Sequence, residues 1–75
     1  MEKIKMAIVG AGTWGLNHAR IYHDHPFAET VAVCDTDTSK ANKLAAQFGV
    51  KQVYTDYREM AAKSGCDAVA IVTPD

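Results

Sequence analysis

Apolar residues fall into short runs, separated by stretches in which apolar positions recur every three or four residues. The short runs predict strands, because they are rich in β-branched residues and bounded by glycine, proline or aspartate. They cover residues 4–9, 30–34, 52–54 and 68–72. The first run is apolar apart from Lys5, which is typical of a strand covered on both faces.

Helical spacing predicts three helices between these strands. The first covers about 13–22, with Leu16, Ala19 and either Ile21 or Tyr22 facing the sheet. Residues 24–26, Asp-His-Pro, predict the turn after it, because a residue before proline avoids the helical region.

Local signals mark the ends of the other two helices. Asp37 or Thr38 is expected to cap the second helix, which ends near Phe48. Gly49 follows this helix, at the position where a helix commonly ends with a residue in the left-handed conformation. Residues 56–59, Asp-Tyr-Arg-Glu, predict a capping-box-like start to a short third helix that ends before Gly65.

Strand and helix alternate three times before a last strand. Right-handed crossovers then predict an α/β fold, a Rossmann-type parallel sheet of order 3-2-1-4 with helices on both faces, truncated after the fourth strand. We interpret residues 1–75 as the amino-terminal part of a dinucleotide-binding domain, with any second, catalytic domain absent. The fourth strand has an unpaired, uncharged outer edge, so we expect the isolated chain to pair through that edge or to be marginally stable.

Composition and charge narrow the function classes. The 75 residues are 48% hydrophobic and 23% charged, with a formal net charge of −1, which favours neither nucleic acid nor an anionic membrane as partner. No apolar run approaches the roughly 20 residues that span a bilayer. The first residues do not resemble a signal peptide. Cys34 and Cys66 are expected to be reduced, mostly buried thiols. A cytoplasmic protein is therefore expected.

The candidate chemistry lies in the loop after the first strand. Gly10 would form the tight turn, Gly12 would let the backbone approach a pyrophosphate, and Gly15 would let the helix pack close to the strand. The helix N-terminus would direct N–H groups at the phosphates. Asp35, twenty residues beyond Gly15, falls where a carboxylate accepts hydrogen bonds from a ribose diol, although it could instead cap the following loop.

Charge beside Asp35 bears on the choice of cofactor. A 2′-phosphate requires arginine or lysine there, whereas Asp35, Thr36 and Asp37 follow the second strand and the nearest cation is Lys40. Two carboxylates would repel that phosphate. NAD is therefore predicted over NADP.

Four further residues belong to the predicted cofactor site. Thr13 and Trp14 stand inside the glycine loop, where Trp14 could shield the pyrophosphate or face a second domain. Thr73 and Pro74 follow the fourth strand, at the sheet edge where such folds bind ligands. Pro74 could shape the loop near the nicotinamide or simply terminate the strand.

No catalytic or metal-binding constellation emerges. His18 and His23 are five residues apart, not the four that would bring two imidazoles together on a helix, and His25 adds no ligand cluster. We assign these histidines ordinary surface or packing roles. No Ser-His-Asp triad or carboxylate pair can be argued.

From residue 7 to 75 the chain resembles the oxidoreductase family named for glucose–fructose oxidoreductase, inositol dehydrogenase and the rhizopine-catabolism protein MocA. The segments that carry the resemblance are 9–15 (Val-Gly-Ala-Gly-Thr-Trp-Gly), 18–19 (His-Ala), 33–35 (Val-Cys-Asp), 54–57 (Tyr-Thr-Asp-Tyr), 67–69 (Asp-Ala-Val) and 72–74 (Val-Thr-Pro). The resemblance implies oxidation of a sugar or polyol hydroxyl with NAD or NADP. It also implies a second domain and catalytic residues beyond residue 75, so this chain alone is expected to bind nucleotide without catalysis.

Other functions fit the glycine loop less well. An NAD(H)-sensing or regulatory module would use the same loop without turnover. A methyltransferase using S-adenosylmethionine typically has an acidic residue where this chain has Val9, and an FAD protein generally has glutamate at the position of Asp35.

Overall fold

The computed structural model describes residues 3–10 and 12–72, with the side chains of 13–15 outside the description. The elements over these residues are β1 (Ile4–Val9), α1 (Thr13–Asp24), β2 (Ala28–Cys34), α2 (Thr38–Phe48), β3 (Gln52–Tyr54), α3 (Tyr57–Lys63) and β4 (Ala68–Ile71). All the predicted elements are confirmed in type and order. Their ends differ from the predicted ends by one or two residues at most.

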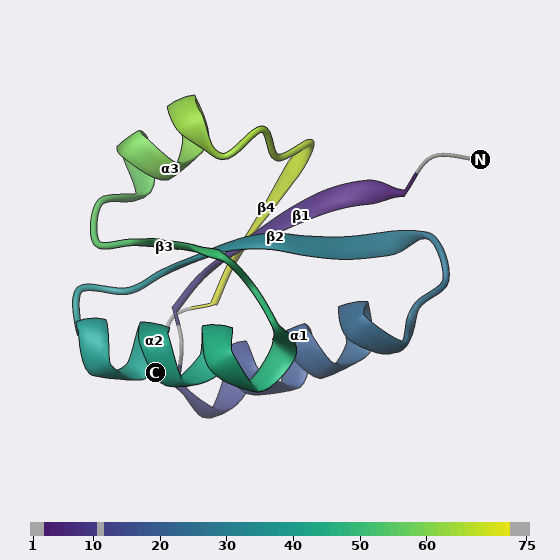
Figure 1. Cartoon of the computed structure of the whole chain (residues 1–75), viewed down its shortest axis with the longest axis horizontal. Coiled ribbons are helices and arrows are strands. Elements are labelled where there is room, and N and C mark those ends of the chain that lie inside the picture. Colours follow the sequence, from purple (N-terminus) through teal and green to yellow (C-terminus); the bar gives the residue numbers. More distant parts are fainter. Residues whose placement is uncertain (1–2, 11, 73–75) are drawn as a thin grey trace.

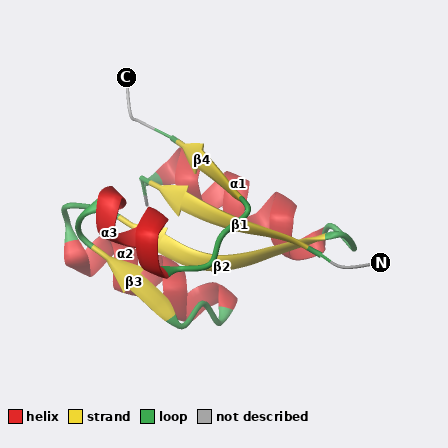
Figure 2. Ribbon diagram, turned by 90° about the horizontal axis from the view of Figure 1, so that it is seen from above, coloured by secondary structure: helices red, strands yellow, loops and turns green. Residues whose placement is uncertain are grey.

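The strands form one parallel sheet of order β3-β2-β1-β4, as predicted. Helices α1 and α2 cover one face of the sheet, and α3 covers the other (Figure 1). Viewed from above, β3 and β4 form the two edges, with β1 and β2 between them (Figure 2). This is the Rossmann-type arrangement that the alternating pattern predicts.

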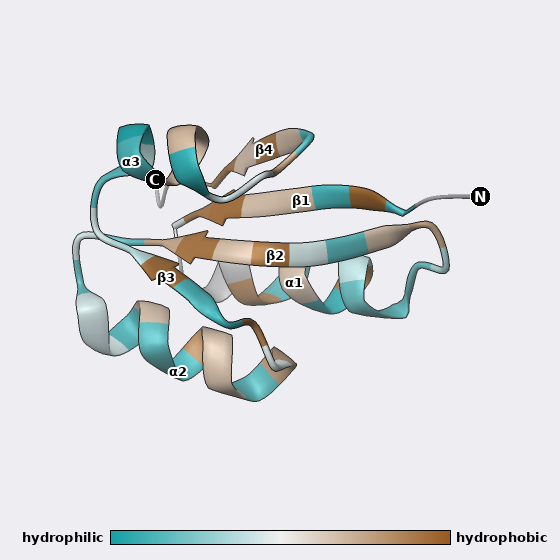
Figure 3. Ribbon diagram, turned by 45° about the horizontal axis from the view of Figure 1, so that its top comes forward, coloured by the Kyte–Doolittle hydropathy of each residue, from teal (hydrophilic) through white to brown (hydrophobic). Residues whose placement is uncertain are grey.

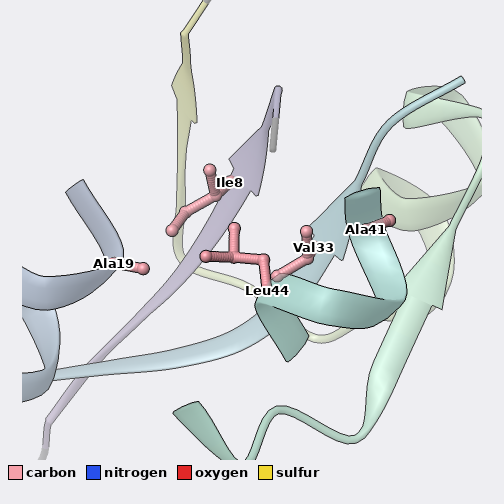
Figure 4. Packing of buried hydrophobic residues seen from close by; sticks show 5 residues of the cluster. All are labelled: Ile8, Ala19, Val33, Ala41 and Leu44. Carbon is pink, nitrogen blue, oxygen red and sulfur yellow. The ribbon is translucent and has the colours of Figure 1, made fainter. Parts of the chain in front are cut away.

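Two small apolar clusters hold the layers together, one on each face of the sheet. Because successive strand residues point to opposite faces, the neighbours Ala7 and Ile8 enter different clusters. The cluster beneath α1 and α2 consists of Ile8, Ala19, Val33, Ala41 and Leu44 (Figure 4). The cluster beneath α3 consists of Ala7, Ala32, Cys34 and the fully buried Met60.

Two expectations about burial need refinement. Tyr22 packs against the α1–α2 cluster, whereas Ile21 is 62% exposed, which settles the choice left open on the first helix. The expectation that β1 is covered on both faces along its length is wrong, since Ile4 is 52% exposed. The pairing of β4 with β1 begins only at Met6, so the start of β1 extends past its neighbour.

The predicted helix caps are present. Asp37, not Thr38, is the N-cap of α2, and its side chain accepts hydrogen bonds from the backbone N–H groups of Ser39 and Lys40. Gly49 ends this helix in the left-handed conformation, with φ of 69°. Asp56 caps α3 by accepting from the N–H of Arg58. These contacts fix where each loop leaves the sheet.

Candidate functional site

The carboxyl ends of β1, β2 and β4 are tied together by backbone hydrogen bonds. The N–H of Gly10 donates to the Cys34 carbonyl at 2.8 Å, so the hydrogen bonding between β1 and β2 extends to Gly10. On the other side, the N–H of Val72 donates to the Val9 carbonyl at 2.8 Å. In parallel α/β sheets, ligands bind at this edge.

Gly10 forms the predicted tight turn. Its φ is +103°, a value that residues with a side chain rarely adopt. A Cβ atom added at Gly10 would overlap the carbonyl oxygen of Val72. The fold itself therefore requires glycine at this position.

Gly12 is in a different situation. It is the N-cap of α1, with φ of −80°, and no described atom lies within 4 Å of a Cβ added there. Without a side chain it also supplies no cap to the helix, whose first turn carries no acidic residue. The N–H groups of that turn consequently form a place where an anionic group can be stabilised.

Asp35 lies directly after β2, as predicted. Its carboxylate oxygen Oδ1 accepts a hydrogen bond from the N–H of Asp37 at 2.8 Å, and its own N–H donates to the Tyr54 carbonyl at 3.1 Å. The loop-capping role left open by the sequence is therefore present. A carboxylate has about four lone-pair sites, so this contact is compatible with a second one to a ligand.

Negative charge gathers around the ends of β2 and β3. Burial raises the pKa of the Cys34 thiol above its ordinary value, and the carboxylates of Asp35 and Asp56 raise that pKa further. The thiol therefore stays protonated and is not a ready nucleophile. Asp56 was not among the predicted site residues, because only the fold brings the end of β3 beside the end of β2.

The remaining predicted site residues are only partly described. Thr13, Trp14 and Gly15 form the first turn of α1, with their side chains outside the description. Thr73 and Pro74 lie outside the described residues, so their predicted roles stay predictions.

The histidines make local contacts. Nδ1 of His18 lies 3.0 Å from the Tyr22 hydroxyl, and the ring of His23 packs against Phe48 with centroids 5.5 Å apart. Nδ1 of His25 accepts from the N–H of Phe27 in the turn after α1. Within 3–10 and 12–72, no three His, Cys, Asp or Glu side chains form a group able to hold a metal ion.

Comparison with known proteins agrees with this geometry. Residues 4–75 match the family described as an oxidoreductase family with an NAD-binding Rossmann fold. The chain is 32% identical over 73 residues to D-apiose dehydrogenase of Paraburkholderia graminis, covering 97% of this chain and 20% of that protein. It is 38% identical over 74 residues to inositol 2-dehydrogenase 4 of Saccharopolyspora erythraea, covering 97% and 22% respectively.

Solved structures show the same fold. Scyllo-inositol dehydrogenase from Lactobacillus casei, crystallised with NAD(H) and scyllo-inositol, superposes with a TM-score of 0.90 at 30% identity. The match covers 97% of this chain and 22% of that one. The chain thus spans about a fifth of the length of the relatives it matches.

None of the helices over the described ranges is long and apolar enough to cross a membrane. The parallel 3-2-1-4 sheet, the glycine turn at its carboxyl edge and the match over 4–75 agree with one another. The chain belongs to the Gfo/Idh/MocA oxidoreductase family and matches the NAD-binding Rossmann fold of that family.

Proposed function

We propose that this chain is the cofactor-binding part of a dehydrogenase that moves a hydride between the hydroxyl carbon of a sugar or polyol and NAD. One observation carries the proposal: the Gly10 turn, the bare N-terminus of α1 and Asp35 meet at one sheet edge. Relatives named for D-apiose and inositol support the substrate class. In this proposal the chain alone binds NAD(H) without turnover, and the rest of a longer protein supplies the catalytic residues.

Each part of the edge has a proposed role. Gly12 lets the pyrophosphate approach the backbone, and the N–H groups in the turn of Thr13, Trp14 and Gly15 bind its oxygens. Asp35 accepts hydrogen bonds from a ribose diol. Thr73 and Pro74 are proposed to line the nicotinamide side, since they follow β4 at the same edge.

Electrostatics supports NAD in preference to NADP. The charges of Asp35 and Asp56 act on the Cys34 thiol, which shows that both carboxylates are close to the end of β2. A 2′-phosphate bound beside Asp35 would face this negative field. The free thiols of Cys34 and Cys66 also fit a reducing compartment such as the cytoplasm.

The contribution of this chain to hydride transfer is to bind and orient. Bound NAD supplies the carbon that accepts the hydride, and that chemistry belongs to the cofactor. The chain fixes the two ends of the adenosine diphosphate half through the α1 N-terminus and Asp35. No described residue is proposed to move the hydroxyl proton.

The proposal is tested by titrating the chain with NADH and NADPH and following cofactor fluorescence. We expect saturable binding that is tighter for NADH. Gly12→Val should weaken the binding of both cofactors by about tenfold or more, since the valine side chain would fill the space proposed for the pyrophosphate. Because that space is open within the described chain, circular dichroism should stay unchanged.

The Asp35→Asn variant removes the carboxylate charge but keeps a side chain of nearly the same shape. Asparagine keeps an oxygen able to accept from Asp37, so the loop should survive. We expect NADH affinity to fall about tenfold and the preference over NADPH to shrink. Asp24→Asn, at the far end of α1, is the matched control. It should change neither the NADH affinity nor the preference for NADH over NADPH. A folded chain that binds neither cofactor, or an Asp35→Asn variant with unchanged preference, would contradict the proposal.

A further inference from the structure

Asp56 lies just after β3, in the loop that leads to α3. Strands β2 and β3 are parallel and pair Cys34 with Tyr54, so the two strands end level with each other. The N–H of Asp35 donates to the Tyr54 carbonyl at 3.1 Å, which extends this pairing one residue beyond β2. Neighbouring strands lie about 4.8 Å apart, and Figure 3 shows the loops after both strands leaving the same edge of the sheet. Asp35 and Asp56 therefore start from neighbouring points of that edge.

The carboxylate of Asp56 is held in place by the start of α3. Its oxygen Oδ1 accepts a hydrogen bond from the N–H of Arg58 at 2.9 Å. The backbone carbonyl of Asp56 accepts from the N–H of Met60 at 3.1 Å, and the Met60 side chain is fully buried between α3 and the sheet. The fold alone thus fixes this carboxylate, because the cap and the packing of α3 determine where it lies.

The cations on α3 have partners other than Asp56. The guanidinium of Arg58 lies over the Tyr57 ring, 5.8 Å from its centroid. The ammonium group of Lys63 pairs with the Glu59 carboxylate at 3.7 Å. In the part of the chain that the structure describes, neither cation forms an ion pair with Asp56. The end of β3 therefore carries a negative charge that no described ion pair cancels.

The charge of Asp56 acts beyond its own loop. Burial raises the pKa of the Cys34 thiol, and the carboxylates of Asp35 and then Asp56 raise that pKa further. Cys34 is the last residue of β2, directly before Asp35. The field of Asp56 thus reaches the neighbouring strand at the point where the proposed ribose site begins.

We propose that Asp56 is a second determinant of cofactor choice, whose charge disfavours the 2′-phosphate of NADP without touching the cofactor. The inference rests on the proposed function, which places a ribose diol at Asp35. A 2′-phosphate on that ribose would bring negative charge toward two carboxylates, whereas NAD has an uncharged hydroxyl at the same position. Asp35 acts on the cofactor by contact, and Asp56 acts through space.

The contribution of Asp56 should be modest. Its side chain is exposed, so water and salt screen its charge. At a separation of about one Debye length, about 8 Å, we expect Asp56 to contribute about threefold to the preference for NADH over NADPH. This is less than the effect expected of Asp35, whose contact is worth about tenfold in NADH affinity.

Titration of the 75-residue chain and its Asp56→Asn variant with NADH and NADPH, followed by cofactor fluorescence, tests the inference. Asparagine keeps an oxygen that accepts from the N–H of Arg58, so α3 should keep its cap. We expect the variant to bind NADPH about threefold more tightly than the parent, while its NADH affinity changes by less than about 1.5-fold. Raising the sodium chloride concentration from about 0.05 M to about 0.5 M should narrow the difference between the variant and the parent.

Two further variants distinguish a field near the ribose from a general change in charge. Glu29→Gln also removes one exposed carboxylate, but Glu29 lies near the start of β2, about 20 Å from Asp35 at about 3.3 Å per residue. This control should leave both affinities unchanged. Asp56→Lys reverses the charge at the end of β3 and should strengthen NADPH binding more than Asp56→Asn does. Circular dichroism checks that the lysine variant, which loses the cap, remains folded.

The inference and the proposed function fail in different ways. If Asp56→Asn keeps the parent's preference for NADH while Asp35→Asn loses part of it, the role of Asp56 is overturned and the proposed function stands. If Asp56→Asn lowers NADH affinity by as much as it changes NADPH affinity, Asp56 touches the cofactor and the through-space role is overturned. A folded parent chain that binds neither cofactor contradicts the proposed function, and the inference is overturned with it.

Discussion

Gly10 and Gly12 stand two residues apart in the sequence, and their surroundings differ. Gly10 has a positive φ and touches the β4 side of the sheet, so the chain's own packing excludes a side chain there. Gly12 has an ordinary φ and open space around it among the described atoms. Under the proposed function, the open space at Gly12 is where the pyrophosphate approaches the backbone.

Substituting each glycine by alanine should separate these reasons. Gly10→Ala is expected to lower the free energy of unfolding by at least about 2 kcal/mol, because of the left-handed φ and the overlap with Val72. Gly12→Ala should change it by less than about 1 kcal/mol in either direction. Urea unfolding followed by far-ultraviolet circular dichroism measures both. Two variants of equal stability would show that the Gly10 turn is not strained.

Cys34 makes stability depend on pH. Its pKa is raised in the folded chain by burial and then by the carboxylates of Asp35 and Asp56, so above the ordinary pKa of 9.0 the unfolded chain releases a proton that the folded chain keeps. The free energy of unfolding should therefore be unaffected below that pH and fall above it.

Urea unfolding at neutral pH and above pH 9.0 tests this expectation against two alanine variants. Cys34→Ala should lose less stability than the parent between the two conditions, although it is less stable at neutral pH because it leaves a small cavity. Cys66→Ala is the control thiol and should follow the parent. A Cys34→Ala variant with the parent's alkaline loss would refute the assignment.

Among the elements, α2 depends most visibly on its cap. Asp37 accepts from two N–H groups of the first turn, at 3.0 and 3.3 Å, while its own N–H donates to Asp35. The loop after β2 and the start of α2 are thus one hydrogen-bonded unit. Capping by Asp37 therefore also orients the residue proposed to bind ribose.

Asp37→Ala should cost about 1 kcal/mol in the free energy of unfolding, whereas Asp37→Asn, which retains an acceptor, should cost much less. Thr38→Ala tests the alternative cap and should stay within about 0.5 kcal/mol of the parent, since the Thr38 side chain is exposed. Thermal and urea denaturation measure all three. A larger loss at Thr38 than at Asp37 would reverse the cap assignment.

Element by element, prediction succeeded where the signal is local. The cap residue before α2, Gly49 after it and the apolar runs of β1 to β4 are readable from neighbours in the chain. It failed where burial depends on distant segments. Nothing near Ile4 in the sequence shows that β4 begins only opposite Met6, and periodicity alone could not choose between Ile21 and Tyr22.

At the scale of the molecule, β3 and β4 are the two outer strands of the described sheet. The two apolar clusters lie around β1 and β2, and the β4 edge lies outside both. A chain of 75 residues buries a limited core, and part of its apolar surface remains exposed on β4.

The sequence by itself determined the strand–helix order, the 3-2-1-4 sheet and the candidate positions Gly10, Gly12 and Asp35, because these rest on local periodicity, turn chemistry and the handedness of crossovers. Only the tertiary structure decided that Val72 crowds Gly10, that Asp56 adds its charge beside Asp35, and that Tyr22 packs inward while Ile21 is exposed. Those facts depend on contacts between segments far apart in the chain, and such contacts leave no local pattern.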